Sequence, residues 1–217
     1  MHVALLPAKP PPLAKTRLSP LLGPKDRAAV SHAMFTDVLA ALTGSRLLDA
    51  IIVVTADDHL AREARAAGAL TVAERTPIGL NAAVSLGTVA ARELGASSTL
   101  VVLSDIPLLR SLDIDELIRR APAQGALVVP SKEGTGTNAI LRRPPHAFPT
   151  YFGGNSLDRH LAAAADRRLR CDVLRSRWVE LDIDTPEDLR VLASEESHTA
   201  TYRETLRLGL ARLRPTA

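Results

Sequence analysis

The stretch TLVVLSDIP, residues 99–107, joins a short apolar run to an aspartate, Asp105. A continuous apolar run of this length is typical of a strand that is covered on both faces, as in parallel sheets. In such sheets ligand sites lie at the carboxyl ends of the strands, and Asp105 occupies that position. The stretch therefore predicts a fold class and one side of a functional site.

Similar apolar runs occur before and after this stretch, and sequences with helical periodicity separate them. We expect strands at residues 3–6, 50–54, 99–103, 126–129 and 138–141. Their alternation with helices predicts an α/β fold with a mostly parallel central sheet and helices on both faces. A chain of 217 residues suits one domain, and with 3% aromatic residues its core must be built from Ala, Val, Leu and Ile.

Helix starts are marked by prolines in the first turn and by acidic caps. We expect one helix from Pro24, one after Asp57 that closes before Gly68, one over residues 80–94, and one that begins at a capping box of Asp113 with Glu116.

Composition and charge narrow the function classes. The net charge of +3 fits a solvated surface or the attraction of anionic substrates, but no basic stripe interleaved with aromatics indicates nucleic-acid binding. The single cysteine, Cys171, excludes an intrachain disulfide. No apolar run reaches about 18 residues, and the N-terminal apolar stretch is too short for a signal peptide. We therefore expect a cytoplasmic protein without a membrane span; its oligomeric state stays open, with a homodimer as one arrangement.

The loop after the first strand, PAKPPPLAKTRLSP, carries Lys9, Lys15 and Arg17. Its prolines restrict the backbone, so an ordered triphosphate cradle is one interpretation and a solvated basic loop is the other. The loop lacks the glycine patterns of the Walker A and dinucleotide-binding motifs, which disfavours a kinase-type site.

Two separate stretches supply carboxylates. Asp105 at a strand end can hold a hard cation, although it could also be a turn or cap residue. In WVELDIDTPEDL, residues 178–189, we expect Asp182 and Asp184 on a strand, where a spacing of two turns both side chains the same way. The residues that follow, Thr185, Pro186 and Asp188, are typical of a helix start.

Two glycine and hydroxyl clusters suggest a second anionic substrate. In SKEGTGTNAI the segment ending at Thr137 either approaches a phosphate closely or forms a β-turn. In YFGGNSLDRH, Gly153 precedes a short helix opened by Ser156, whose free N–H groups attract anions or are merely capped. We expect His160, the histidine nearest these clusters, to be structural.

Taken in order, the stretches PAKPPPLAKTRLSPLL, LSDIP, GTGTNAIL, FGGNSLDRH and LDIDTPEDL resemble the 2-phospho-L-lactate guanylyltransferase family, whose bacterial members include phosphoenolpyruvate guanylyltransferases. The resemblance covers roughly residues 1–192. It implies a single-domain, Rossmann-like (GT-A-like) nucleotidyltransferase fold, similar to molybdenum-cofactor guanylyltransferases, over residues 1–193. Residues 194–217 would form an accessory helix or tail.

The resemblance also implies roles for individual residues. Mg²⁺ would be held by Asp105, Asp182 and Asp184. The phosphorylated acid would be bound by Thr137, Gly153 and Ser156. The nucleotide would be bound by Lys9, Lys15, Arg17, Asn81 and Ser104; the three cations together with Asp105 would be catalytic. Two positions depart from the family pattern: Ser104 stands where glycine is usual, and Lys132-Glu133 precedes the GTGT stretch.

The predicted reaction moves GMP from GTP to phosphoenolpyruvate, 2-phospho-L-lactate or 3-phosphoglycerate with release of pyrophosphate, in coenzyme F-420 biosynthesis. Three alternatives stay open at this point. One is a related nucleotidyltransferase acting on a sugar phosphate or molybdopterin. Another is a sugar-transferring enzyme that binds a nucleotide sugar through Asp182 and Asp184. The third is a non-catalytic nucleotide-binding module.

Overall fold

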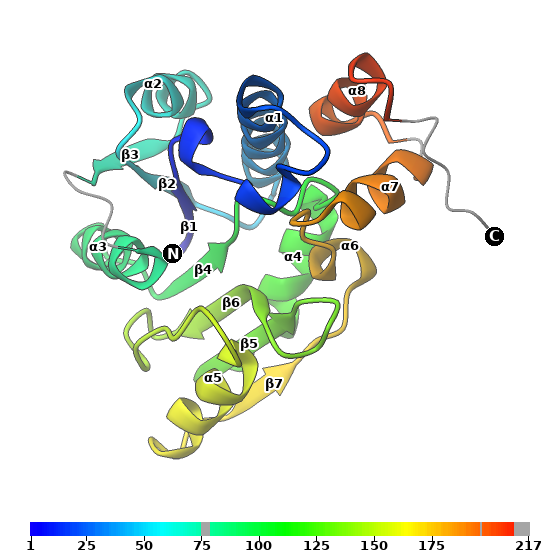
Figure 1. Cartoon of the computed structure of the whole chain (residues 1–217). Coiled ribbons are helices and arrows are strands. Elements are labelled where there is room, and N and C mark those ends of the chain that lie inside the picture. The colour runs from blue at the N-terminus through cyan, green and yellow to red at the C-terminus, as the bar shows by residue number, and fades with distance from the viewer. Residues whose placement is uncertain (75–78, 196, 211–217) are drawn as a thin grey trace.

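The structure, a computed structural model, describes residues 1–74, 79–195 and 197–210 (Figure 1). Its centre is a seven-stranded sheet in the order β3-β2-β1-β4-β6-β5-β7. The strands are β1 (His2–Ala8), β2 (Ala50–Thr55), β3 (Leu70–Ala73), β4 (Ser98–Val102), β5 (Gly125–Pro130), β6 (Thr137–Arg143) and β7 (Cys171–Val173). Only β6 is antiparallel to its neighbours, so the predicted mostly parallel sheet is confirmed. The sequence did not predict β3 and β7, because these short edge strands lack a continuous apolar run.

Helices cover both faces of the sheet, as predicted. They are α1 (Pro24–Thr43), α2 (Asp58–Ala66), α3 (Leu80–Glu93), α4 (Ser111–Arg120), α5 (Ser156–Ala165), α6 (Arg177–Glu180), α7 (Pro186–Ser194) and α8 (Ala200–Arg207). One core cluster joins the sheet to α1, α2 and α4, and another joins it to α3 and α5. These two sets of helices cover opposite faces of the sheet (Figure 1). Within the described residues, no helix is both long and apolar enough to span a bilayer.

The central strand β1 shows why its sequence is a continuous apolar run. Ala4 and Leu6 pack in the cluster under α1, whereas Val3 and Leu5 pack in the cluster under α3. All four are fully buried, and burial of a Val or Leu side chain stabilises a fold by about 1.5–3 kcal/mol. The strand's carboxyl end is thereby held rigidly, and the basic loop begins there.

Two local predictions are wrong. Helix α4 starts after Arg110, whose N–H donates to Asp113 Oδ2 at 3.0 Å, so Asp113 is the third helical residue of the box rather than its first member. Glu116 instead pairs with Arg120 one turn later. Residues 181–184 form no strand, because they follow α6 directly and pair with no neighbouring strand.

The start of α7 agrees with its prediction. The hydroxyl of Thr185 accepts from Asp188 N–H at 3.3 Å, Asp188 Oδ2 accepts from Thr185 N–H at 2.7 Å, and Pro186 occupies the first turn. Lys132 also bonds the Asp188 carboxylate. Burial opposes ionisation of Asp188, but these hydrogen bonds outweigh it and lower its pKa. The charge of Asp188 thus stabilises the turn that carries Asp184.

The chain beyond α7 packs on the same domain. Asp37 of α1 accepts hydrogen bonds from the N–H groups of Ala200 and Thr201 at 2.6 and 2.8 Å, which caps α8. Residue 196 and residues 211–217 of the predicted tail lie outside the described residues, and the proposed boundary at residue 193 stays a prediction.

Candidate active site

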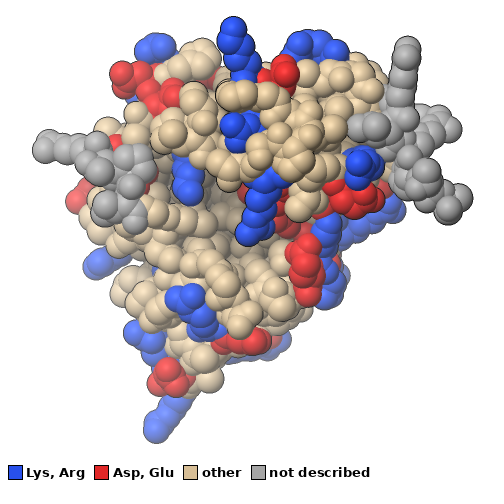
Figure 2. Space-filling model, viewed as in Figure 1, with Lys and Arg blue, Asp and Glu red and all other residues tan. Residues whose placement is uncertain are grey.

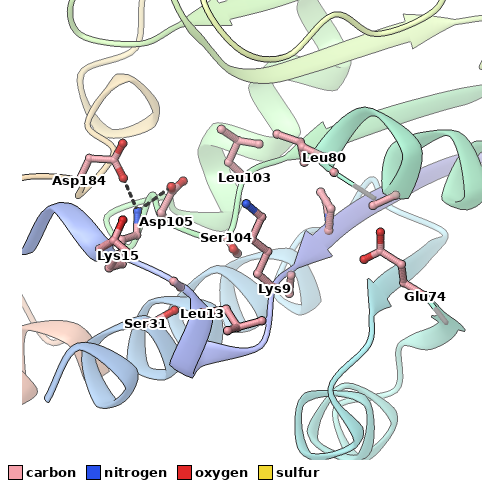
Figure 3. Close-up of a pocket in the computed structure, with 16 residues that line it drawn as sticks. Lys9, Leu13, Lys15, Ser31, Glu74, Leu80, Leu103, Ser104, Asp105 and Asp184 are labelled. Carbon is pink, nitrogen blue, oxygen red and sulfur yellow. Dashed lines mark hydrogen bonds and ion pairs between the residues drawn. The ribbon is translucent and has the colours of Figure 1, made fainter. Parts of the chain in front are cut away.

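A cleft opens at the carboxyl ends of β1 and β4, beside the start of α3 (Figure 3). Five predicted site residues line it: Lys9, Lys15, Ser104, Asp105 and Asp184. In the space-filling view this face of the molecule is hollowed, with basic side chains beside the hollow (Figure 2). The fold therefore gathers side chains that are far apart in the chain.

The basic loop is ordered by two 3₁₀ turns, Pro11–Leu13 and Thr16–Leu18. Leu18 is fully buried against α1 and α7, which anchors the loop. Lys9 points into the cleft (Figure 3). Arg17 is different, because its side chain is 75% exposed and reaches only the outer side of Asp184, at 3.5 Å.

Lys15 lies between two of the predicted metal ligands. Its Nζ donates to Asp105 Oδ2 at 2.8 Å and to Asp184 Oδ1 at 2.7 Å (Figure 3). The side chain is 7% exposed. Burial alone would lower the pKa of Lys15, but the charges of the two aspartates and their hydrogen bonds outweigh it and raise that pKa. Lys15 is thus a fixed cation in the cleft.

Asp182 joins this group through the backbone. The N–H of Ile183 donates to the carbonyl of Asp105 at 2.9 Å, which brings residues 181–184 against the end of β4. The pKa of Asp182 rises to about 6: burial is the main cause, the charges of Asp105 and Asp184 add to it, and a hydrogen bond from Asn138 opposes it. Three carboxylates therefore repel one another near the carboxyl end of β4, and the positive charge of Lys15 partly offsets this repulsion.

The chemistry of this set fits a hard divalent cation, which takes oxygen ligands. Asp105 Oδ1 is buried and has no hydrogen-bond partner among the described residues. Burying a carboxylate oxygen without a partner lowers the free energy of unfolding, unless a cation or a hydrogen-bond donor contacts that oxygen. However, the oxygens of the three aspartates do not all lie within 4.8 Å of one another. Asn138 bonds Asp182 whereas Lys15 bonds Asp184. Since residues 181–184 form no strand, the alternation that was expected to align the two side chains does not apply.

Asn138 is a site residue that the sequence argument missed. Val129 pairs with Ala139 while Pro130 pairs with Thr137, so Asn138 is an extra residue in β6. Such a bulge redirects side chains, and it is common beside functional sites. The amide of Asn138 donates to Asp182 Oδ1 at 3.0 Å and to two carbonyls of α6. The sequence signal that could have identified Asn138 was a polar amide at the start of the apolar run of residues 138–141.

A second group forms around His160, which is fully buried. Its Nε2 lies 2.8 Å from the N–H of Tyr151, which can only donate, so Nε2 is an acceptor. Burial, together with the charges of Arg142 and Arg159, lowers the pKa of His160 to about 4, so the ring is neutral. Its proton is therefore on Nδ1, which donates to Thr137 Oγ1 at 3.1 Å. This assignment leaves the hydroxyl proton of Thr137 free to donate elsewhere.

The two predicted acceptor clusters meet at the start of α5. The carbonyl of Thr135 accepts from Leu157 N–H at 3.0 Å, which joins the GTGT turn to the helix. Gly153 has φ +118°, a conformation that favours glycine, and Ser156 is buried at the first helical position. Among the described residues, neither these two nor Thr137 lines the cleft that holds Lys15.

Asn81 has a contact that the sequence did not anticipate. Its side chain donates to the Phe152 carbonyl at 3.0 Å and accepts from the Phe152 N–H at 2.8 Å. It thereby ties α3 to the segment that precedes Gly153, and its predicted contact with nucleotide stays a prediction. Glu74, directly after β3, is a buried carboxylate that lines the cleft and was also missed, because β3 was not predicted.

Solved structures of other proteins share this fold. A structure from Desulfovibrio desulfuricans G20, described as that of a candidate nucleotide-diphospho-sugar transferase, superposes with a TM-score of 0.79 at 20% identity, covering 98% of this chain and 97% of that one. The fold is also similar to that of a nucleotidyl transferase from Methanothermobacter, with a TM-score of 0.62 at 16% identity, covering 99% of each chain.

Sequence comparisons define the family. Residues 2–214 match the family model described as "Guanylyl transferase CofC like". The phosphoenolpyruvate guanylyltransferase of Sphaerobacter thermophilus is 36% identical over 191 residues, 88% of this chain and 92% of that protein. The 2-phospho-L-lactate guanylyltransferase of Methanothermobacter thermautotrophicus is 33% identical over 207 residues, 94% of this chain and 90% of that protein. The chain belongs to the CofC-like guanylyltransferase family and is a nucleotidyltransferase. The match also continues beyond residue 193, farther than the resemblance noted from the motifs.

Proposed function

We propose that this enzyme transfers GMP from GTP to a small phosphorylated carboxylic acid and releases pyrophosphate, as a step in coenzyme F-420 biosynthesis. The names of the relatives support the nucleotide and the kind of acceptor. The observation that carries the proposal is the placement of the Lys15 ammonium between Asp105 and Asp184 in a cleft at the carboxyl ends of the strands.

The cleft binds the nucleotide in this proposal. Lys9 and Lys15 contact the triphosphate from inside the cleft, and Arg17 contacts it from the rim. Ser104, and Asn81 through the segment that it ties to α3, shape the pocket. Fixed cations act where negative charge develops as the α-phosphorus is attacked.

The aspartates Asp105, Asp182 and Asp184 hold Mg²⁺ in this proposal. When bound, the ion offsets phosphate charge and orients the leaving pyrophosphate. The orphaned Asp105 Oδ1 and the mutual repulsion of the carboxylates support this assignment, because a divalent cation relieves both. The hydrogen bond from Asn138 would fix the orientation of the Asp182 carboxylate.

The acceptor binds at Thr137, Gly153 and Ser156. The free hydroxyl proton of Thr137 donates to an oxygen of the acid, and the N–H of Ser156 at the start of α5 donates to the same anion. One phosphate oxygen of the acceptor forms a bond to the α-phosphorus of GTP while the bond to the bridging oxygen breaks. That phosphate is already ionised at neutral pH, so no general base is needed. Catalysis comes from positioning and charge stabilisation.

Pyrophosphate release tests the proposal. Purified enzyme is assayed with GTP, CTP or UTP and with phosphoenolpyruvate, 2-phospho-L-lactate, 3-phosphoglycerate or a sugar phosphate, and products are weighed by mass spectrometry. We expect a guanylylated acid that forms only with a divalent cation. Asp105→Ala should lose nearly all turnover, whereas the exposed Asp58→Ala should keep it. Full turnover by Asp105→Ala would contradict the assignment of Asp105 as a metal ligand. A guanylylated sugar as the product would show that the acceptor is a sugar phosphate and not a carboxylic acid.

A further inference from the structure

A second group of metal-ligand side chains lies between α1 and α2, outside the active-site cleft. The side chains of His32, His59 and Glu63 each offer one ligand atom, and these atoms all lie within 4.8 Å of one another. His59 and Glu63 are four residues apart on α2, so they share one helix face. His32 reaches them from α1.

The distances fit a shared ion. His32 Nε2 lies 2.7 Å from Glu63 Oε2, and the two imidazole centroids are 5.3 Å apart. Two imidazoles that bind one tetrahedral zinc at about 2.0–2.1 Å per bond place their centroids roughly 5 Å apart. The His32–Glu63 pair must separate by less than about 1 Å to admit the ion.

The carboxylate is already oriented by a neighbouring residue. Thr36 Oγ1 donates to Glu63 Oε1 at 2.8 Å and also contacts the His32 carbonyl at 3.1 Å. One Glu63 oxygen is thereby held while Oε2 contacts His32 Nε2. Among the described residues, the His59 ring makes no hydrogen bond, and it is exposed to solvent. Contacts like that of Thr36 with Glu63 fix the orientation of metal ligands in known sites.

We propose that His32, His59 and Glu63 bind a divalent transition metal, with Zn²⁺ as the best fit, through two imidazole nitrogens and one carboxylate oxygen. Three protein ligands leave a fourth position for water. Nitrogen ligands select zinc over magnesium, so this site and the all-oxygen cleft take different ions. The ion joins α1 to α2, and α1 also carries Ser31, which lines the cleft. The proposal does not depend on the proposed reaction.

Titration of the metal-free, tag-free chain tests this site. We measure Zn²⁺ binding by calorimetry and Co²⁺ binding by its visible spectrum, and we record the melting temperature with and without Zn²⁺. With millimolar Mg²⁺ present to compete for the all-oxygen cleft, we expect one saturable zinc site, a tetrahedral Co²⁺ spectrum and a higher melting temperature with zinc. His59→Ala should weaken binding by more than roughly tenfold and abolish the thermal shift, and Thr36→Val should weaken binding by roughly tenfold.

Two controls separate this site from other zinc binding. His146→Ala removes an exposed histidine elsewhere and should bind zinc like the wild type. Asp105→Ala alters the cleft and should also retain the site. Equal zinc affinity in wild type and His59→Ala, loss of binding in Asp105→Ala, or no saturable binding would each overturn the proposal, leaving His32 and Glu63 as a plain hydrogen-bonded pair.

Discussion

The buried imidazole of His160 makes protein stability depend on pH in a way that can be measured. In the folded protein its pKa is about 4, whereas an unfolded histidine titrates near about 6.5. Below pH 6.5 the unfolded chain binds a proton that the folded chain refuses, so stability falls with pH and the loss saturates near pH 4. The loss is about 2 kcal/mol by pH 5 and about 3 kcal/mol in full.

The variant His160→Gln isolates this contribution. Its amide oxygen can still accept from the Tyr151 N–H, but the side chain does not titrate. We expect the variant to be less stable than wild type at pH 7.5, because Thr137 loses its hydrogen bond to Nδ1 and glutamine fills the space of the buried ring less well. Between pH 7.5 and 5 the variant should lose about 2 kcal/mol less than the wild type does. All other titrating groups are common to both proteins.

Urea denaturation at several pH values between 7.5 and 5 gives the free energies of unfolding. The exposed His146→Gln serves as control and should follow the wild-type curve. Parallel pH profiles for wild type and His160→Gln would refute the neutral, Nδ1-protonated ring. The orientation argument for the Thr137 hydroxyl would then fail with it.

Three further predictions concern the site. Lys15→Met should lower the free energy of unfolding by about 2 kcal/mol in EDTA, because the two aspartates lose their buried cation but are themselves partly solvated. Millimolar Mg²⁺ should restore part of this loss. An unchanged urea midpoint in EDTA would contradict a stabilising role for the Lys15 ion pairs. Asn138→Ala should cost about 1–3 kcal/mol in urea unfolding and lower kcat, whereas Gln124→Ala, which removes an exposed amide, should do neither. Equal effects of the two substitutions would show that the amide at the bulge has no special role. Thr137→Val should raise KM for the acid by roughly tenfold and leave KM for GTP unchanged, whereas Thr137→Ser should stay near wild type. A higher KM for GTP instead would indicate that Thr137 contacts the nucleotide.

Several features of this protein were readable from local sequence. Continuous apolar runs predicted the buried strands β1, β2, β4, β5 and β6, because a strand covered on both faces must be apolar throughout. Thr185, Pro186 and Asp188 predicted the start of α7, because capping is a local interaction. The ordered motifs indicated the family, which the family match then confirmed.

Other features depended on contacts between distant segments. Short edge strands such as β3 carry little apolar signal, so Glu74 was missed together with its strand. The apparent strand at Asp182 follows a helix and meets no free sheet edge, which the alternation of its side chains does not reveal. Asn138 became a site residue only through a one-residue bulge, whose position depends on pairing between β5 and β6.

The sequence alone determined the layered fold, the carboxyl-end location of the cleft and most of the charged groups around it, because periodicity and capping act over a few residues. Tertiary structure alone decided that Lys15 sits between Asp105 and Asp184 and that His160 orients Thr137. Those pairings join residues that the chain separates widely, and their protonation is set by burial and neighbouring charge, which exist only once the chain has folded.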